Sequence, residues 1–518
     1  MSAFSPTPRA PSALRAHLGE IELRRIMPER LVRPASLLLG TIAVLLIGVF
    51  CARLAASHYG KTAIYALIGV PLLIAVAQRP LIAIMALLAV ASSIFTYGSL
   101  PRVNVPGHPP INVVDLLLIA AVGGTLLRRP WHSWPVPVRR YAVALLVFVL
   151  VSAVATFKTL SLGHVEARAA LYNFRNFLYL AAAITIALEL RGELWKPFLN
   201  AAIVFAAIIG ALSVAGALSP SVAHVLRTLT PWSVQSAARS FGSTTAALGT
   251  GARIRLQGLY FVYAMIIPTL AMAIMFKDRW RPYRVLALVL MVGAVAVSLN
   301  RNMYAGTVVG LLVTGLLGGP ALRVRLGLVI AAVAVALVLV IATAIVPAVS
   351  ASVGKRAATL ASPSQILQSG SISDRTYELS FALPAIGRHP WFGVGPLQPY
   401  GALDNQFTIT QRTSVQDLYI DLATDYGIPA ALAFLIVPGM ALWFGVRHVG
   451  RSRDPLDRAL LSAAVGMVVA LLLSLLVGTY VQTPESTTAF GVALGLLLAC
   501  SVRMRELAPS RTHGSPSN

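Results

Sequence analysis

Acidic residues and cysteines are scarce in this sequence, whereas long apolar runs dominate it. Charged residues make up 12% of the 518 positions and hydrophobic residues 57%, while an average soluble protein has roughly 25% charged residues. A soluble protein of this size could not bury so much apolar surface. The composition therefore excludes intrinsically disordered, collagen-like, coiled-coil and disulfide-framework proteins, and it predicts a polytopic membrane protein.

Several chemical signatures are also missing. The two cysteines, Cys51 and Cys500, lie in apolar runs expected near opposite faces of the bilayer, so no disulfide is expected. No Cys/His grouping has zinc spacing, and there is no P-loop, GxGxxG, HExxH or GxSxG motif. Neither a nucleotide-driven nor a metal-hydrolase mechanism has support, and no cofactor or metal site is predicted.

Basic residues are abundant in comparison. There are 42 Lys and Arg against 18 Asp and Glu, which gives a net charge of +24. In a soluble chain this excess would indicate nucleic-acid binding. In a membrane protein it first indicates cytoplasmic loops, which collect Lys and Arg, so no nucleic-acid partner is expected.

The apolar runs predict an all-α fold of about 12–14 transmembrane helices, since a span needs about 20 mainly apolar residues. The range reflects two tight pairs, 62–78 with 80–97 and 284–299 with 303–319, either of which could be re-entrant or merged. The fourteen candidate spans are 37–56, 62–78, 80–97, 112–127, 141–156, 173–189, 199–218, 257–276, 284–299, 303–319, 326–348, 425–446, 459–479 and 486–503.

The loop charges then predict the orientation. Most Lys and Arg residues fall on one side if both termini are cytoplasmic, as the positive-inside rule requires. The expected location is therefore a membrane that the chain crosses several times. The predicted parts are a basic cytoplasmic tail (1–36), transmembrane helices 1–11 (37–348), a large periplasmic loop with short helices (349–424), helices 12–14 (425–503) and a cytoplasmic tail (504–518).

The predicted spans contain almost no deep ionisable residue. Asp115 and Arg175 each fall near an outer end, and no span centre carries a chain of charged groups suited to proton or sodium coupling. We also find no internal repeat of the kind transporters show. Both absences disfavour a lipid-linked oligosaccharide flippase or other transporter, which is the alternative function.

Arginines instead gather at the predicted outer boundary, where the positive-inside rule does not favour them. Arginine binds phosphate through a planar fork whose charge is permanent, so converging arginines could hold the diphosphate of a lipid-linked donor and stabilise charge on the leaving group. The alternatives are headgroup snorkelling and salt bridges to Asp374 or Glu378. The candidate substrate-binding residues are Arg253, Arg255, Arg301, Arg375 and Arg388.

The large loop contains a glycine- and proline-rich segment, 386–396. It predicts a rigid turn with close backbone approach, whose exposed N–H groups could meet an oxyanion or sugar hydroxyls, or which could be a structural corner. Upstream, 374–387 predicts a short surface helix with one apolar face formed by Leu379, Leu383 and Ile386.

Three carboxylates open the next predicted span. Asp417, Asp421 and Asp425 recur every four residues and so share one helical face. They could pair with the arginines, act as a general base, or cap and hydrate the start of the helix.

Together these segments resemble the O-antigen ligase/O-antigen polymerase superfamily of bacterial membrane glycosyltransferases. The resemblance covers about 253–435. Four features carry it: Arg255-Leu-Gln-Gly258 before a span, Ser298-Leu-Asn-Arg301 between two spans, Arg375 followed by Pro390-Trp-Phe-Gly-Val-Gly395, and Gln416-Asp-Leu-Tyr-Ile420 with Gly427-Ile-Pro429 after it.

The resemblance implies a metal-independent, inverting transfer of a glycan from an undecaprenyl-pyrophosphate-linked donor to a sugar hydroxyl on the periplasmic face. It implies that arginines hold the diphosphate. The family usually has a histidine where this chain has Gln416, which cannot accept a proton as a base. Either Asp417 or Asp421 takes that role, or leaving-group stabilisation matters more, or the activity has changed.

Polymerase and ligase both stay open, because they share a donor and differ in acceptor. A non-catalytic scaffold for envelope assembly is a further alternative. The expected partners are the lipid-linked donor, a glycan or lipid-glycan acceptor and membrane lipids. A chain-length regulator or other envelope-assembly proteins are further candidates.

Overall fold

The fold is described from a computed structural model. The chain divides into two units, Met1–Leu72 and Leu73–Asn518, and all but one of the described residues belong to the second. The structure describes residues 73–91, 111–162, 167–191, 194–229, 258–298, 300–320, 370–396, 417–452, 454–476 and 483–507, the short segments 102–103, 234–236 and 252–254, and the single residues 71, 322, 327, 398, 400, 415 and 478.

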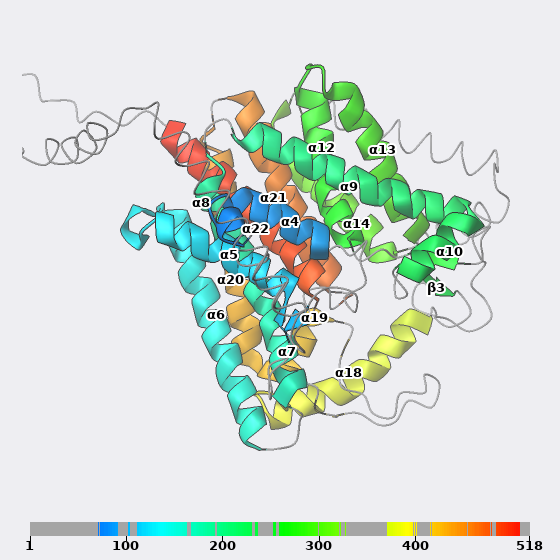
Figure 1. Cartoon of the computed structure of the whole chain (residues 1–518). Helices are drawn as coiled ribbons and strands as arrows, with labels where there is room; N and C mark the ends of the chain where they lie inside the picture. The colour runs from blue at the N-terminus through cyan, green and yellow to red at the C-terminus, as the bar shows by residue number, and fades with distance from the viewer. Residues whose placement is uncertain are drawn as a thin grey trace, which may run out of the picture. The chain divides into compact units, whose positions relative to one another are not determined.

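Helices form nearly all of the described residues of the second unit (Figure 1). In chain order they are α4 (Pro80–Ala91), α5 (Val113–Arg128), η1 (Trp131–Ser133), α6 (Val136–Ser161), α7 (Ala167–Phe177), η2 (Leu178–Ala181), α8 (Ala182–Glu189), α9 (Trp195–Leu218), α10 (Pro220–Leu229), α12 (Leu259–Met275), α13 (Arg281–Ser298), α14 (Arg301–Leu317), α18 (Gly370–Arg388), α19 (Leu418–Tyr426), α20 (Ile428–Val449), α21 (Pro455–Leu475) and α22 (Pro484–Leu507).

Two short antiparallel pairs of strands accompany the helices. Strand β1 (Arg102–Val103) pairs with β2 (Ile111–Asn112). Strand β3 (Val234–Ser236) pairs with β4 (Ala252–Ile254), in a register that places Gln235 opposite Arg253.

The predicted class, an all-α polytopic membrane protein, is confirmed. Among the described residues, seven helices are long and apolar enough to cross a membrane, and three shorter apolar helices accompany them. The seven are Val136–Ser161, Ala170–Glu189, Trp195–Leu218, Arg281–Ser298, Ile428–Val449, Pro455–Leu475 and Pro484–Arg503. The predicted spans 37–56 and 326–348 fall almost wholly outside the described residues.

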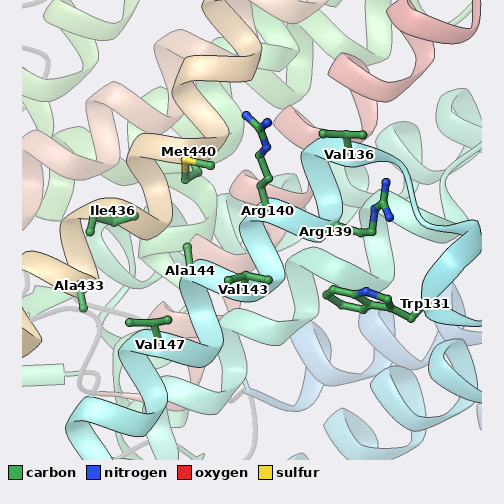
Figure 2. Close-up of a pocket in the computed structure, with 10 residues that line it drawn as sticks. All are labelled: Trp131, Val136, Arg139, Arg140, Val143, Ala144, Val147, Ala433, Ile436 and Met440. Carbon is green, nitrogen blue, oxygen red and sulfur yellow. The ribbon is translucent and has the colours of Figure 1, made fainter.

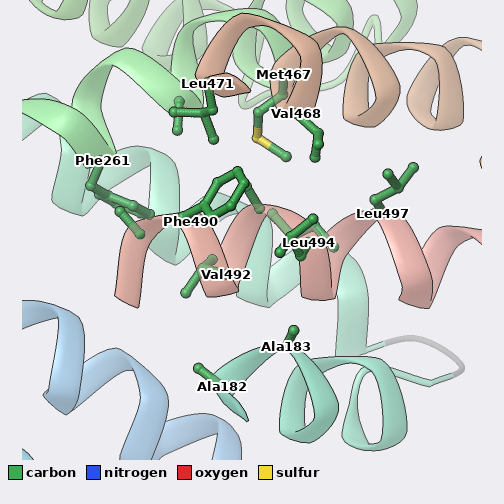
Figure 3. Close-up of a cluster of buried hydrophobic side chains, with 14 of the residues drawn as sticks. Ala182, Ala183, Phe261, Met467, Val468, Leu471, Phe490, Val492, Leu494 and Leu497 are labelled. Atoms are coloured by element: carbon green, nitrogen blue, oxygen red, sulfur yellow. The ribbon is translucent and has the colours of Figure 1, made fainter. Parts of the chain in front are cut away.

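Helix α22 forms the centre of the core. It packs against α8, α20 and α21, with further contacts to α4 and α12, and 94% of its apolar window is buried. Figure 3 shows Phe490 and Leu494 of α22 between side chains of α21 and the short side chains of α8. Gly495 permits this close approach, because a Cβ at that position would lie only 3.0 Å from the Ala183 Cα. Such small residues are typical of membrane helix interfaces.

Peripheral helices have the opposite character. Only 39% of the apolar window of α6 and 33% of that of α13 are buried. Phe157 of α6 and Val289 of α13 are among the exposed apolar side chains. These faces suit contact with lipid chains.

The predicted surface helix is present as α18, and of the three residues of its predicted apolar face Ile386 packs against the core and Leu379 is half-buried. Leu383 is 55% exposed, whereas Glu378, Ala382 and Ala385 are buried. Helix α18 contacts α19.

Candidate functional site

The C-terminal end of α21 is a meeting point for three other helices. Side chains from α12, α14 and α19 donate hydrogen bonds to its last carbonyl groups, which a helix leaves partly without backbone partners. Tyr263 bonds to Ala470 O at 2.8 Å, Tyr260 to Leu471 O at 3.3 Å, Tyr419 to Leu472 O at 2.9 Å and Asn302 to Ser474 O at 3.4 Å.

Three of these four donors lie in or next to a segment that the sequence singles out. Tyr260 follows Gly258, Asn302 follows Arg301, and Tyr419 follows Asp417 by two positions. The fold therefore brings the starts of α12, α14 and α19 to one place, although they lie far apart in the chain, at Leu259, Arg301 and Leu418. Burial raises the pKa of the Tyr419 phenol, with Asp417 adding to the shift, so this donor stays protonated.

A second set of backbone contacts joins the end of α18 to the junction of α19 and α20. Val394 N donates to Thr424 O at 2.8 Å, and Gly395 N donates to Asp425 O at 3.1 Å. In return, Ile428 N donates to Pro390 O at 2.8 Å. The loop after α18 is thus held by backbone hydrogen bonds, which do not depend on flexible side chains.

Glycines make this contact possible. Gly393, Gly395 and Gly427 have φ values of 65°, 110° and 89°, a region that side chains disfavour. A Cβ at Gly427 would also lie too close to the Trp391 carbonyl, and one at Gly395 would strike Thr159 of α6. The predicted rigid turn with close backbone approach is confirmed.

Of the two alternatives for this segment, the backbone contacts of three residues favour the structural corner. The N–H groups of Val394 and Gly395 bond to α19, and that of Gly393 bonds to His389 O at 3.0 Å. None of the three is available for an oxyanion or a sugar hydroxyl, because packing the loop against α19 uses them.

The predicted carboxylates occupy different settings. Asp417 is the N-cap of α19, and its Oδ1 accepts from the N–H groups of Tyr419 at 2.9 Å and Ile420 at 3.1 Å. Asp417 is half-buried. Asp421 is 0% exposed and accepts from Val415 N at 2.7 Å, and Asp425 is also buried.

The structure locates the predicted arginines only in part. Arg253 lies in β4, Arg301 is the first residue of α14, and Arg375 lies in α18, but their side chains are outside the described residues. Arg255 and Gln416 lie wholly outside them. Arg388 is exposed, and its Nε donates to Pro384 O of its own helix at 3.3 Å.

A buried ion pair joins two charges that the sequence suggests only singly. Arg175 Nη1 lies 2.9 Å from Asp115 Oδ2, and the Arg175 guanidinium stacks over Tyr172 at 4.6 Å. Asp115 also accepts from Tyr179 OH at 2.6 Å and Asn112 N at 2.7 Å. In the sequence, the signal for this pair is limited to one acidic and one basic residue, each within an otherwise apolar run.

Next to this pair, Phe177 packs on Tyr426 of α19 at 5.3 Å between ring centroids. The ion pair is therefore close to the carboxylate-bearing helix. In the part of the chain that is described, no group of three or more His, Cys, Asp or Glu residues could hold a metal ion.

Residues 286–435 match the family model described as O-antigen ligase. This part of the chain is therefore similar to the O-antigen ligase family. The predicted resemblance to the O-antigen ligase/polymerase superfamily is thereby confirmed. No curated protein matches the chain.

The O-antigen ligase domain runs from α13 into α20. It contains Arg301, Arg375 and Asp417, whereas Arg253 and Arg255 precede it. The match supports glycan transfer in surface polysaccharide assembly, with a lipid-linked glycan donor and a glycan acceptor in general. Together with the apolar helices, it supports an integral bacterial membrane protein.

Proposed function

We propose that this protein transfers a glycan from an undecaprenyl-pyrophosphate-linked donor to a sugar hydroxyl at the periplasmic face of the inner membrane. The observation that carries the proposal is the convergence of α12, α14 and α19 on the end of α21, which gathers the starts of three segments of the predicted site. Two of these helices belong to the O-antigen ligase domain.

In this proposal arginines hold the diphosphate. Arg301 precedes Asn302, whose amide bonds to the carbonyl end of α21. That end carries the negative pole of the helix dipole, which favours a cation nearby. Arg253, Arg255, Arg375 and Arg388 are the further proposed ligands. Fixed positive charge would stabilise the pyrophosphate as the glycosidic bond breaks, and the acceptor oxygen would attack from the opposite side, inverting the configuration.

Asp417 is the proposed base for the acceptor hydroxyl. It is half-buried, whereas Asp421 is fully buried and bonded to Val415 N. A base must come within hydrogen-bond reach of the proton it removes, and only the partly exposed carboxylate can meet a substrate without rearrangement of its own helix. Gln416 would then bind the acceptor rather than take its proton.

The test uses a strain that lacks the protein and is complemented with variants, with surface and lipid-linked glycans separated by chain length. Arg301→Ala and Arg375→Ala should each abolish complementation while the protein stays in the membrane. Arg451→Ala, at an exposed position in another loop, should complement fully. Full activity of both site variants would refute the diphosphate clamp.

The same fractions distinguish the type of enzyme. Single repeats that accumulate on the lipid carrier would indicate a polymerase. Long chains that stay on the carrier would indicate a ligase. No change in either fraction would refute the proposed transfer.

Asp417→Asn separates the role of a base from that of a helix cap, because asparagine caps helices about as well as aspartate. We expect transfer to fall about 10²–10⁴-fold, the usual range for loss of a general base, with an unchanged melting temperature. Asp454→Asn, at the exposed cap of α21, is the matched control and should transfer normally. Normal transfer by Asp417→Asn across a pH series would exclude it as the base.

A further inference from the structure

An apolar groove lies between α6 and α20, on a face of the unit that the proposed reaction does not use. Its volume is about 670 Å³. Figure 2 shows α6 on one side and α20 on the other. The lining residues are Trp131, Val136, Arg139, Arg140, Val143, Ala144, Val147, Ala433, Ile436 and Met440.

The two ends of the groove differ in chemistry. Figure 2 shows the guanidinium groups of Arg139 and Arg140 at one end and the small apolar side chains of Val147 and Ala433 at the other. Val147 is 46% exposed and Ile436 53% exposed. In a membrane protein, such a surface contacts acyl chains.

The arginines at the basic end have no acidic partner in the described part of the chain. The contact seen for Arg140 is with the Phe444 ring, at 5.9 Å. Nearby arginines differ, because Arg128 and Arg129 both lie within 4 Å of Glu189. Two adjacent guanidinium groups beside an apolar groove match an anion that carries an apolar chain.

An aromatic residue at the same end strengthens this match. Trp131 is 50% exposed and packs against Trp134 at 4.7 Å between ring centroids. The Trp134 indole is held in place by a hydrogen bond to Arg129 O at 2.7 Å. Tryptophan favours the interface between headgroups and chains, so this end of the groove suits headgroup depth.

We propose that this groove binds an anionic phospholipid of the cytoplasmic leaflet. The lipid phosphate contacts Arg139 and Arg140, and one acyl chain lies along Val143, Val147 and Ile436. The leaflet follows from the positive-inside orientation predicted for the loop before α6. Basic pockets between membrane helices on this side suit anionic headgroups.

The groove is separate from the proposed reaction site. Thr159, at the other end of α6, packs against Gly395 of the loop after α18. Arg140 and Thr159 are about 28 Å apart along the helix at 1.5 Å per residue. The lipid is therefore bound to the scaffold that carries the junction of α18, α19 and α20, on the opposite side of the bilayer.

The test is native mass spectrometry of the full-length protein in mild detergent, titrated with phosphatidylglycerol or phosphatidylcholine of the same chain length. We expect preferential retention of phosphatidylglycerol by the wild type. Arg139→Gln/Arg140→Gln should reduce that retention about tenfold or more. The control Arg279→Gln/Arg451→Gln removes the same charge from exposed positions in other loops and should bind normally.

A second variant tests the apolar part. Val147→Trp fills the groove from a partly exposed position and leaves the charge unchanged, and it should also reduce retention. Inorganic phosphate in excess should not displace the lipid, because it lacks the chain. Equal retention of the two lipids, or equal loss in the control variant, would overturn the proposal, as would displacement by phosphate.

Discussion

Two arginine-bearing regions of the second unit differ in what their guanidinium groups contact. Arg175 is largely buried beside Asp115, with 13% of its side chain exposed, and Asp115 accepts from Tyr179 and Asn112 as well. Arg139 and Arg140 border an apolar groove without a carboxylate partner among the described residues. The first region uses its charge to hold the fold together, whereas the second leaves its charge available for a ligand. Substitutions should therefore cost stability in one region and binding in the other.

Asp115→Ala should have the largest effect on stability. It removes the carboxylate that lies 2.9 Å from Arg175 in a largely buried setting, and breaking a buried pair typically costs about 3–5 kcal/mol. The measurement is thermal unfolding of the purified protein in detergent. Asp454→Ala removes an exposed helix cap and should cost only about 0.5–2 kcal/mol.

Removing both partners sharpens this test. Asp115→Asn/Arg175→Met removes both charges of this pair, and it should be more stable than Asp115→Ala alone. If the double variant is the less stable of the two, then the arginine contributes mainly through its stacking on Tyr172, and the view of this region as an ion pair would be wrong.

Gly427→Ala should come next. The φ of 89° and the proximity of the Trp391 carbonyl both oppose a side chain, and a backbone conformation of this kind costs about 1–3 kcal/mol outside glycine. Gly439→Ala, within α20 and with open space around its Cβ position, should instead stabilise by about 0.5–1 kcal/mol. Equal melting temperatures for the two variants would contradict the close contact between the loop and the α19–α20 junction.

Asp278→Asn should have the smallest effect. Arg284 bonds to both oxygens of Asp278, at 2.8 and 3.0 Å, and lowers the pKa of that carboxyl. Because the Asp278 side chain is 41% exposed, the cost should be on the order of 1 kcal/mol.

The pH dependence of this pair has a definite sign. A carboxyl whose pKa is lower in the folded state stabilises the protein above the ordinary aspartate value of about 3.9, and that stabilisation is lost as the pH falls through the folded value. The wild type should therefore lose more stability than Asp278→Asn on acidification below about pH 4. Parallel curves for the two proteins would show that the pair contributes nothing.

The helices were largely predictable, because apolar runs of span length leave the backbone few alternatives. The predicted spans 459–479 and 199–218 correspond closely to α21 and α9. Periodicity placed Leu383 on the apolar face of α18, but it could not show which of these side chains would be buried: Leu383 is 55% exposed and Ala382 is buried. The contacts between helices were harder still, since nothing local in the sequence joins Tyr419 to Leu472 or Asp115 to Arg175.

The candidate site, like the fold, was predictable from the sequence only in part. The glycine-rich turn was predictable, because its composition demands unusual backbone conformations. The fate of its N–H groups was not, since it depends on the carbonyls of Thr424 and Asp425 across the contact. The roles of Arg301, Arg375 and Asp417 stay predictions.

The position of α22 has a consequence for biosynthesis. This most buried of the candidate spans is made after every other described helix, yet it contacts α4, α8 and α12 from the first half of the unit. Those helices enter the membrane before their shared partner has left the ribosome. These helices can complete their packing only after α22 is made, and until then their small-residue surfaces are exposed to lipid. A chain that stops before residue 484 would insert its earlier spans without acquiring the core that joins them.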